Sequence, residues 1–172
     1  MSELTSAAVP PVGPEDHMRG RGEELIVYAD LGCPHCAAAW ERISVLPARL
    51  VFRHLPMASE HPRSPALHGA AEAAGSQGKF FEMVDSLFGD HGRVDDPHLW
   101  ERADRFGIDL ERFEAERRSA EVEARVRRDF ESGIRAGVTG TPALFQGGDL
   151  VSLDDLDSSP RGTRNEERGT PL

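Results

Sequence analysis

The sequence predicts an α/β fold, and three observations support this prediction. Two short β-rich apolar runs enclose a helix-forming segment, a long helical region follows, and two further short runs surround a Gly-Gly turn. A strand, a helix and a second strand in this order form a βαβ unit whose crossover is right-handed. At 172 residues the chain fits one domain carrying an insertion.

The first strand and helix are predicted from composition and spacing. Residues 25–29 (Leu-Ile-Val-Tyr-Ala) are an apolar run typical of a strand that is buried on both faces. From Cys36 onward, strong helix formers continue until Pro47, with Trp40, Ile43 and Leu46 at three-residue spacing. Residues 49–54 again have strand character and complete the βαβ unit.

The region from about 57 to 135 is predicted to be an inserted helical subdomain. Asp96 followed by Pro97 is typical of a helix start. We expect helices at 64–74, 79–88, 97–106, 110–119 and 121–135. The apolar side chains expected in their core are Phe80, Met83, Val84, Leu87, Trp100 and Phe106.

The remaining segments set the expected domain limits. Residues 137–145 and 150–151, on either side of a Gly-Gly turn, predict an antiparallel hairpin. Residues 1–22 are predicted to be a flexible leader, 23–157 the folded domain, and 158–172 a disordered tail. A C-terminal helix, if present, is expected to be short, and homodimerisation is one way to cover the sheet that it leaves open.

Composition restricts the function classes. The formal net charge is −10, which argues against a nucleic-acid or anionic-membrane partner and favours proteins or peptides. No run approaches the roughly 20 apolar residues that a membrane span needs. The first residues lack a basic region followed by an apolar one, so we expect a cytoplasmic protein.

The two cysteines, Cys33 and Cys36, form a Cys-Pro-His-Cys motif between the first strand and the helix. A disulfide between cysteines three positions apart closes too short a loop to stabilise a fold. No second cysteine pair completes a zinc site, so we expect redox chemistry without metal or cofactor. Cys33 at the helix N-terminus is the expected nucleophile, because the helix dipole stabilises its thiolate. Cys36 is expected to resolve the mixed disulfide, while Pro34 and His35 tune the redox potential.

These segments, with Thr141-Pro142 before the hairpin, resemble a DsbA-like protein of the thioredoxin superfamily over about residues 24–151. The resemblance implies a thioredoxin-like fold with a helical insertion and a cis Thr141–Pro142 bond beside the cysteines. It implies a protein thiol–disulfide oxidoreductase (a reductase, an isomerase or an oxidase) that binds clients at Thr141 and Pro142 and needs a recycling partner. A redox-sensing or regulatory binding domain with little catalysis is the alternative, and some relatives are fused behind sodium–proton antiporters.

Two further groups of polar residues have more than one interpretation. His54, His61 and His68 recur every seven residues, but a strand end, two prolines and a helix separate them. We interpret them as solvated or locally bonded histidines, and not as metal ligands. Asp30 or Glu24 is a candidate for a buried acid that relays a proton to Cys36, against the alternative of a structural or exposed carboxylate.

Overall fold

The structure, a computed structural model, describes residues 6–158 and contains a five-stranded mixed sheet. In space the strands follow the order β1-β3-β2-β4-β5. Strands β2 and β3 are parallel, and the other neighbouring pairs are antiparallel. The strands are β1 (His17–Gly20), β2 (Glu24–Ala29), β3 (Arg49–His54), β4 (Ala143–Gln146) and β5 (Asp149–Val151).

The predicted βαβ unit is confirmed. Helix α1 (Pro34–Ile43) connects β2 to β3, which align with Leu25 opposite Leu50 and Ala29 opposite His54. Since both strands run the same way, the chain leaves each of them at one edge of the sheet. The loop that carries the cysteines and the loop after His54 therefore lie side by side.

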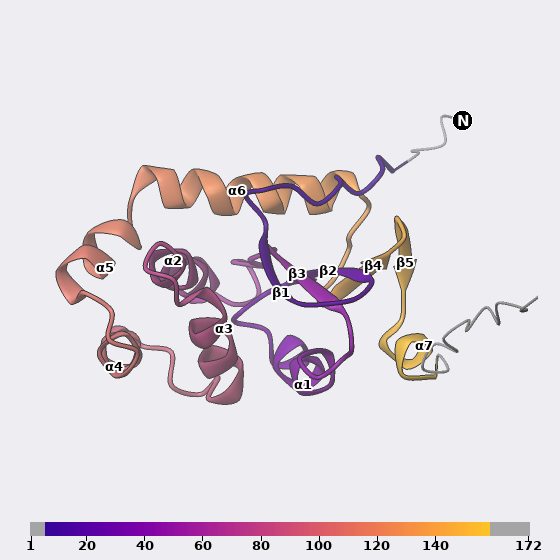
Figure 1. Ribbon diagram of the computed structural model, residues 1–172. Coiled ribbons are helices and arrows are strands. Elements are labelled where there is room, and N and C mark those ends of the chain that lie inside the picture. The colour runs from indigo at the N-terminus through magenta and orange to yellow at the C-terminus, as the bar shows by residue number, and fades with distance from the viewer. Residues whose placement is uncertain (1–5, 159–172) are drawn as a thin grey trace, which may run out of the picture.

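The helical insertion is confirmed as well, and it lies between β3 and β4. Figure 1 shows α6 along one face of the sheet, α1 and α7 (Leu153–Ser158) on the other, and α2–α5 beside them. The helices of the insertion are α2 (Ser64–Gly75), α3 (Phe80–Gly89), α4 (Asp96–Arg105), α5 (Leu110–Glu116) and α6 (Ala120–Arg135).

Alternate residues of β2 enter two separate cores, as the pleat of a strand dictates. Leu25 and Val27 pack with α1, α2 and α3, whereas Ile26 and Tyr28 face α6. Helix α6 approaches the sheet closely at Gly133, where an added Cβ would lie 2.6 Å from a methyl carbon of Leu55. A larger residue at this position would require the buried side chains of Leu55 and Tyr28 to shift, so the close approach of the helix favours glycine.

The structure differs from the predicted leader. Residues 17–20 form β1, which pairs with β3 along the edge of the sheet. The preceding residues are held too, because the Arg53 guanidinium donates to the carbonyls of Pro10 and Pro11 at 2.8 and 3.1 Å. The segment lacks a periodic apolar pattern because an edge strand of four residues buries little of it.

Two details of the insertion also differ from the prediction. Asp95, and not Asp96, is the N-cap residue of α4, and Asp96 instead pairs with Arg63 at 2.8 Å. Trp100 is 41% exposed, and its indole nitrogen donates to Glu114. It therefore lies outside the core, whereas Phe80, Met83, Val84 and Leu87 are buried as expected.

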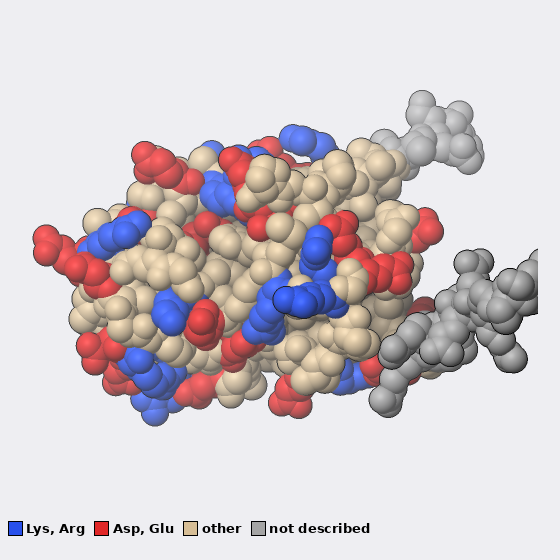
Figure 2. Space-filling view, viewed as in Figure 1, with Lys and Arg blue, Asp and Glu red and all other residues tan. Residues whose placement is uncertain are grey.

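The short C-terminal helix α7 matches the expected departure from a full-length helix. Leu153 and Leu156 pack against the core that α1 covers. All of the expected tail after Ser158 lies outside the described residues. On the face shown in Figure 2, acidic and basic side chains are interspersed.

Candidate redox site

Cys33 and Cys36 lie at the start of α1, at the edge of the sheet where β2 ends. Cys33 is the N-cap residue, and Pro34 occupies the first helical turn. Proline suits this position because the helix leaves its first backbone nitrogens without partners. The two cysteines are unbonded to each other and both are buried, Cys33 with 4% of its surface exposed.

The environment of Cys36 separates the two sulfurs. Burial raises the pKa of the Cys36 thiol to about 12, although hydrogen bonds from Thr141 and from the Asp30 amide oppose the rise. The Asp30 N–H donates to the sulfur at 3.4 Å. The Cys36 thiol also hydrogen-bonds to Cys33, which raises its pKa further. Cys36 is thus held as a thiol against Cys33.

Thr141 and Pro142 reach the redox pair from the far end of the chain. The bond between them is cis, as expected from the resemblance, and β4 begins at the next residue. Both side chains are half-buried, and that of Thr141 contacts Cys36. The structure therefore brings Thr141, and with it the adjoining Pro142, to the sulfur pair from a distant part of the sequence.

The other two predicted residues, Pro34 and His35, lie between the cysteines and are exposed. They form part of the first turn of α1 and point away from the core. Glu24 is exposed at the opposite end of β2, so it is not the buried acid near Cys36. Of the two candidate carboxylates, the structure leaves Asp30.

Asp30 is fully buried directly after β2 and organises the loops around it. Its carboxylate accepts from the backbone amides of Gly32 and Met57 at 2.9 and 3.1 Å. Burial alone would raise the pKa of Asp30, but hydrogen bonds, first among them that from His68, lower it to about 2. A charged carboxylate therefore lies behind the redox pair.

The three regularly spaced histidines gather near this carboxylate, although a strand end, two prolines and a helix separate them in the sequence. His61 and His68 contact Asp30 at 3.0 and 3.3 Å, and His54 meets His68 at 2.6 Å. We call Asp30, His54, His61 and His68 the Asp30 cluster. Local bonding of the histidines was predicted, but their meeting was not. The sequence signal for this meeting was the seven-residue spacing of the histidines. They come together because β3, which ends at His54, pairs with β2, which ends directly before Asp30.

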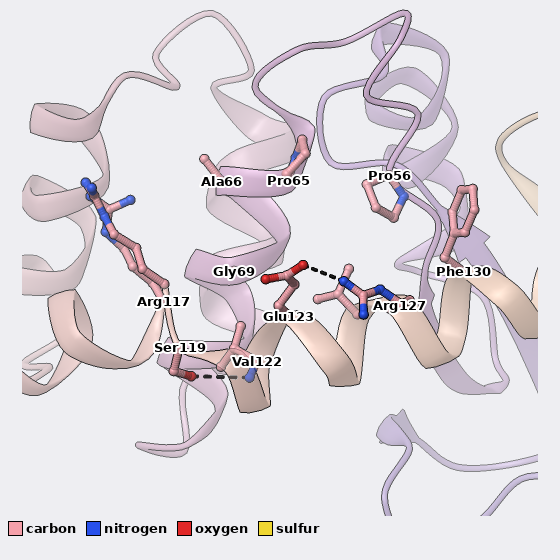
Figure 3. Close-up of a pocket in the computed structure, with 12 residues that line it drawn as sticks. Pro56, Pro65, Ala66, Gly69, Arg117, Ser119, Val122, Glu123, Arg127 and Phe130 are labelled. Carbon is pink, nitrogen blue, oxygen red and sulfur yellow. Dashed lines mark hydrogen bonds and ion pairs between the residues drawn. The ribbon is translucent and has the colours of Figure 1, made fainter.

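A separate groove of about 440 Å³ lies between α2 and α6 and contains none of the predicted site residues. Figure 3 shows Glu123 directed at Arg127 and the Ser119 hydroxyl capping the amide of Val122. Arg117, which also lines it, is paired with Glu114 and Asp96. We call this space the α2–α6 groove. Its named charged groups already have partners within the fold.

Among the described residues, no helix is long and apolar enough to cross a membrane. The curated relatives nevertheless include membrane transporters. In an alignment 184 positions long, the chain is 36% identical to the Na(+)/H(+) antiporter NhaA of Herminiimonas arsenicoxydans. The alignment covers 96% of this chain and 29% of that protein. With the antiporter NhaA 1 of Salinispora arenicola it shares 37% identity, over 80% of this chain and 22% of the relative. The chain thus spans less than a third of the length of these relatives.

Solved structures share the fold. A thioredoxin-like oxidoreductase from Silicibacter pomeroyi superimposes with a TM-score of 0.74 at 25% identity, covering 84% of this chain and 90% of that one. The thiol–disulfide exchange protein alpha-DsbA2 of Wolbachia pipientis gives 0.74 at 21% identity, with 84% of each chain covered. This second likeness concerns the fold alone.

The family model of the DSBA-like thioredoxin domain matches residues 54–159. The match covers more than half of the chain and begins after Cys36, so it does not include the two cysteines. Its extent agrees with the expected fold, since it spans the helical insertion and the hairpin. The chain belongs to the DSBA-like thioredoxin domain family, whose fold is that of thiol–disulfide oxidoreductases.

Proposed function

We propose that this chain is a protein thiol–disulfide oxidoreductase that works through Cys33 and Cys36. One observation carries the proposal: the two sulfurs meet at a helix N-terminus, and the Thr141 side chain hydrogen-bonds to the sulfur of Cys36. A helix N-terminus favours an anion, and a thiolate is the attacking species in disulfide exchange. The cysteines therefore have different environments suited to successive steps.

In the reducing direction, the Cys33 thiolate attacks a client disulfide. A bond forms between Cys33 and one client sulfur, the client disulfide breaks, and the other client sulfur leaves as a thiolate. Cys36 then loses its proton and attacks Cys33, which releases the second client thiolate. The client gains two electrons, and the chain is left with a Cys33–Cys36 disulfide that a recycling partner must reduce. An oxidase runs the same steps in reverse.

Client recognition is proposed at Thr141 and Pro142. The backbone of Thr141 adjoins the redox pair, and an extended client segment can pair with it as an added strand. Pro34 and His35 are exposed beside Cys33, which suits residues that contact a client or tune the redox potential. Reductase or isomerase behaviour and a cytoplasmic location stay predictions.

Trapping tests the nucleophile and resolving roles. Cys36→Ser should accumulate mixed disulfides with client proteins through Cys33, because the second attack is removed. The Cys33→Ser and Cys36→Ser double variant is the matched control and should trap none. Failure of the single variant to form any adduct, together with no reduction of insulin by the unmodified chain, would contradict the proposal.

Thr141→Val tests the contact at Cys36. The variant keeps the shape but removes a hydroxyl whose hydrogen bond lowers the pKa of Cys36. We expect slower resolution of the mixed disulfide, with the first attack by Cys33 little changed. Thr139→Val, two residues earlier, is the matched control.

A second candidate is a redox-responsive domain that acts on a sodium–proton antiporter. The observation in its favour is the similarity of nearly the whole chain to part of proteins named as such antiporters. Antiport measured in everted membrane vesicles, with the chain added reduced or oxidised, distinguishes the two candidates. Equal antiport in both redox states would count against the regulatory role.

A further inference from the structure

His61 lies at the rim of the redox site, in the loop between β3 and α2. A Cβ added to Gly32 would be only 3.0 Å from the Cβ of His61, and Gly32 is the residue directly before Cys33. The side chain of His61 is 24% exposed. An imidazole that solvent can reach therefore packs against the loop that carries the proposed nucleophile.

One ring nitrogen of His61 is held by Asp30, since His61 Nδ1 lies 3.0 Å from Asp30 Oδ2. The carboxylate is ionised near pH 7, because burial, which would raise the pKa of Asp30, is outweighed by hydrogen bonds that lower it to about 2. An ionised carboxylate only accepts, so Nδ1 is the donor, and Nε2 of the neutral ring carries no proton. Among the described residues, none hydrogen-bonds to this Nε2.

The other two histidines near this carboxylate have both ring nitrogens engaged. His54 Nδ1 lies 2.6 Å from His68 Nδ1, and His54 Nε2 lies 2.6 Å from Glu72 Oε1. His68 Nε2 accepts from the Leu31 N–H at 3.0 Å. Neither histidine has exposed side-chain surface. Of the three, His61 alone combines a fixed ring with a nitrogen that a client sulfur can approach.

The loop around His61 is held on both sides of this residue. The His61 N–H donates to the Met57 carbonyl at 2.8 Å, and the His61 carbonyl accepts from the Ser64 N–H at 2.9 Å. The Met57 N–H donates in turn to Oδ2 of Asp30, the same oxygen that His61 contacts. The imidazole is therefore positioned before a client arrives, which reduces the entropy lost when it acts.

The groups that face His61 come from β2, from its own loop and from α2. Asp30, directly after β2, forms an ion pair with it when the ring is protonated. Within the loop, Glu60 is exposed and Arg63 is paired with the first residue of α4. Ser64 at the start of α2 is buried and uncharged. An imidazolium at this position therefore has an ionised carboxylate as its direct partner.

We propose that His61 is the acid–base residue that serves the client sulfur. The inference rests on the proposed function. When the Cys33 thiolate attacks, the client disulfide breaks and Cys33 bonds to one client sulfur, while the departing sulfur takes the electron pair and the Nε2 proton of His61. The imidazole is left neutral and regains a proton from water. In the reverse reaction, neutral Nε2 accepts the proton of the client thiol that attacks the mixed disulfide, and Cys33 leaves as a thiolate.

The benefit of this proton depends on the departing sulfur. An ordinary alkyl thiol titrates near pH 8.5, so it leaves more readily if it is protonated as the bond breaks. General acid catalysis typically contributes about 10²–10⁴-fold, and we expect about tenfold here because a thiolate already leaves moderately well. An aromatic thiolate of low pKa gains little from a proton. The rate with such a leaving group should therefore be insensitive to His61.

Two small disulfides distinguish acid catalysis from packing and charge. Oxidised glutathione and dithiobis-nitrobenzoate both carry carboxylates, but the first releases an alkyl thiolate and the second an aromatic thiolate of low pKa. In a Cys36→Ser background the reaction stops at the Cys33 adduct, which rapid quenching and mass spectrometry follow. His61→Asn keeps an N–H donor in the place of Nδ1 and lacks Nε2, so it preserves the contact with Asp30 and removes the acid.

At pH 7, His61→Asn should slow adduct formation with oxidised glutathione about tenfold and leave that with dithiobis-nitrobenzoate within about twofold. The deficit with glutathione should disappear by pH 9, where an imidazole has lost its second proton. His91→Asn, at an exposed histidine in the loop after α3, is the matched control and should change neither rate. His61→Gln, which also lacks a titratable nitrogen, decides the outcome if His61→Asn does not fold.

Equal slowing with both disulfides would overturn the assignment, because a loss of packing or of charge attraction affects both probes alike. Unchanged rates with both would overturn it as well. If Cys33 forms no adduct with either probe in the Cys36→Ser background, the proposed function itself fails, and this result is distinct from the other two.

Discussion

The Asp30 cluster and the α2–α6 groove differ in the groups that pair with their carboxylates. In the groove, carboxylates pair with arginines such as Arg117 and Arg127. In the cluster, Asp30 is held by backbone amides and histidines. The named charges of the groove are thus paired with guanidinium groups, whereas the carboxylate of Asp30 is paired with imidazoles and neutral amides. The two regions should therefore respond differently to pH.

The largest expected effect separates the two regions by activity. Cys33→Ser removes the proposed nucleophile beside the Asp30 cluster and should reduce insulin reduction more than about 100-fold. Arg127→Gln in the groove alters an exposed charge pair and should leave the rate within about twofold. Turbidity assays of insulin reduction measure both. Equal losses in the two variants would show that the groove takes part in the reaction.

The pH dependence of stability should be concentrated at His68. Burial lowers its pKa from 6.5 to about 4 in the folded chain. Between these values the unfolded chain binds a proton that folded His68 does not, so the free energy of unfolding should fall as pH falls. We expect a loss on the order of 2–3 kcal/mol from pH 6.5 to 4, measured by urea unfolding.

His68→Gln should flatten that slope, while His91→Gln, at an exposed histidine in the loop after α3, should preserve it. Asp30 and Glu72 have pKa values lowered from 3.8 and 4.5, so the stability that they contribute begins to be lost as the pH falls towards these ordinary values. The part of the slope above about pH 5 therefore isolates the histidine. A slope that persists in His68→Gln would place the titrating group elsewhere.

Packing should dominate the response of the groove. An added Cβ at Gly69 would lie 2.4 Å from the backbone oxygen of Arg117. Gly69→Ala should therefore lower the free energy of unfolding by roughly 1–3 kcal/mol without a change in pH dependence. Gly92→Ala is the control, since nothing lies within 4 Å of the corresponding position. A neutral Gly69→Ala would show that α2 and the segment before α6 can separate.

The smallest effect is expected for a charge pair on the rim of the groove. Glu123 and Arg127 are four residues apart on α6 and are 70% and 60% exposed. Glu123→Gln should change the free energy of unfolding by no more than about 0.5 kcal/mol, and less in high salt. Thermal unfolding at two salt concentrations measures it.

The sequence predicted the parts of the fold that depend on local patterns. The apolar run at 25–29 and the breaks at Pro47 and at the glycine turns were sufficient for the strands and helices around them. It could not predict β1, because four edge residues leave no periodic signal. Nor could it predict that His54, His61 and His68 meet near Asp30, since this depends on which strand ends share an edge of the sheet. Trp100 was misplaced because apolar spacing does not show which side of a helix lacks a neighbour.

The short helix α7 is attached to the body of the fold in a way that depends on dissolved ions. Arg42 on α1 pairs with Asp154 and Asp157, and both the arginine and Asp154 are largely exposed. At 1 M ionic strength the Debye length is about 3 Å, so such exposed pairs weaken while the contacts of Leu156 persist. Salt concentration should therefore alter how firmly this end of the sheet is covered, largely independently of pH and of the redox state of the cysteines.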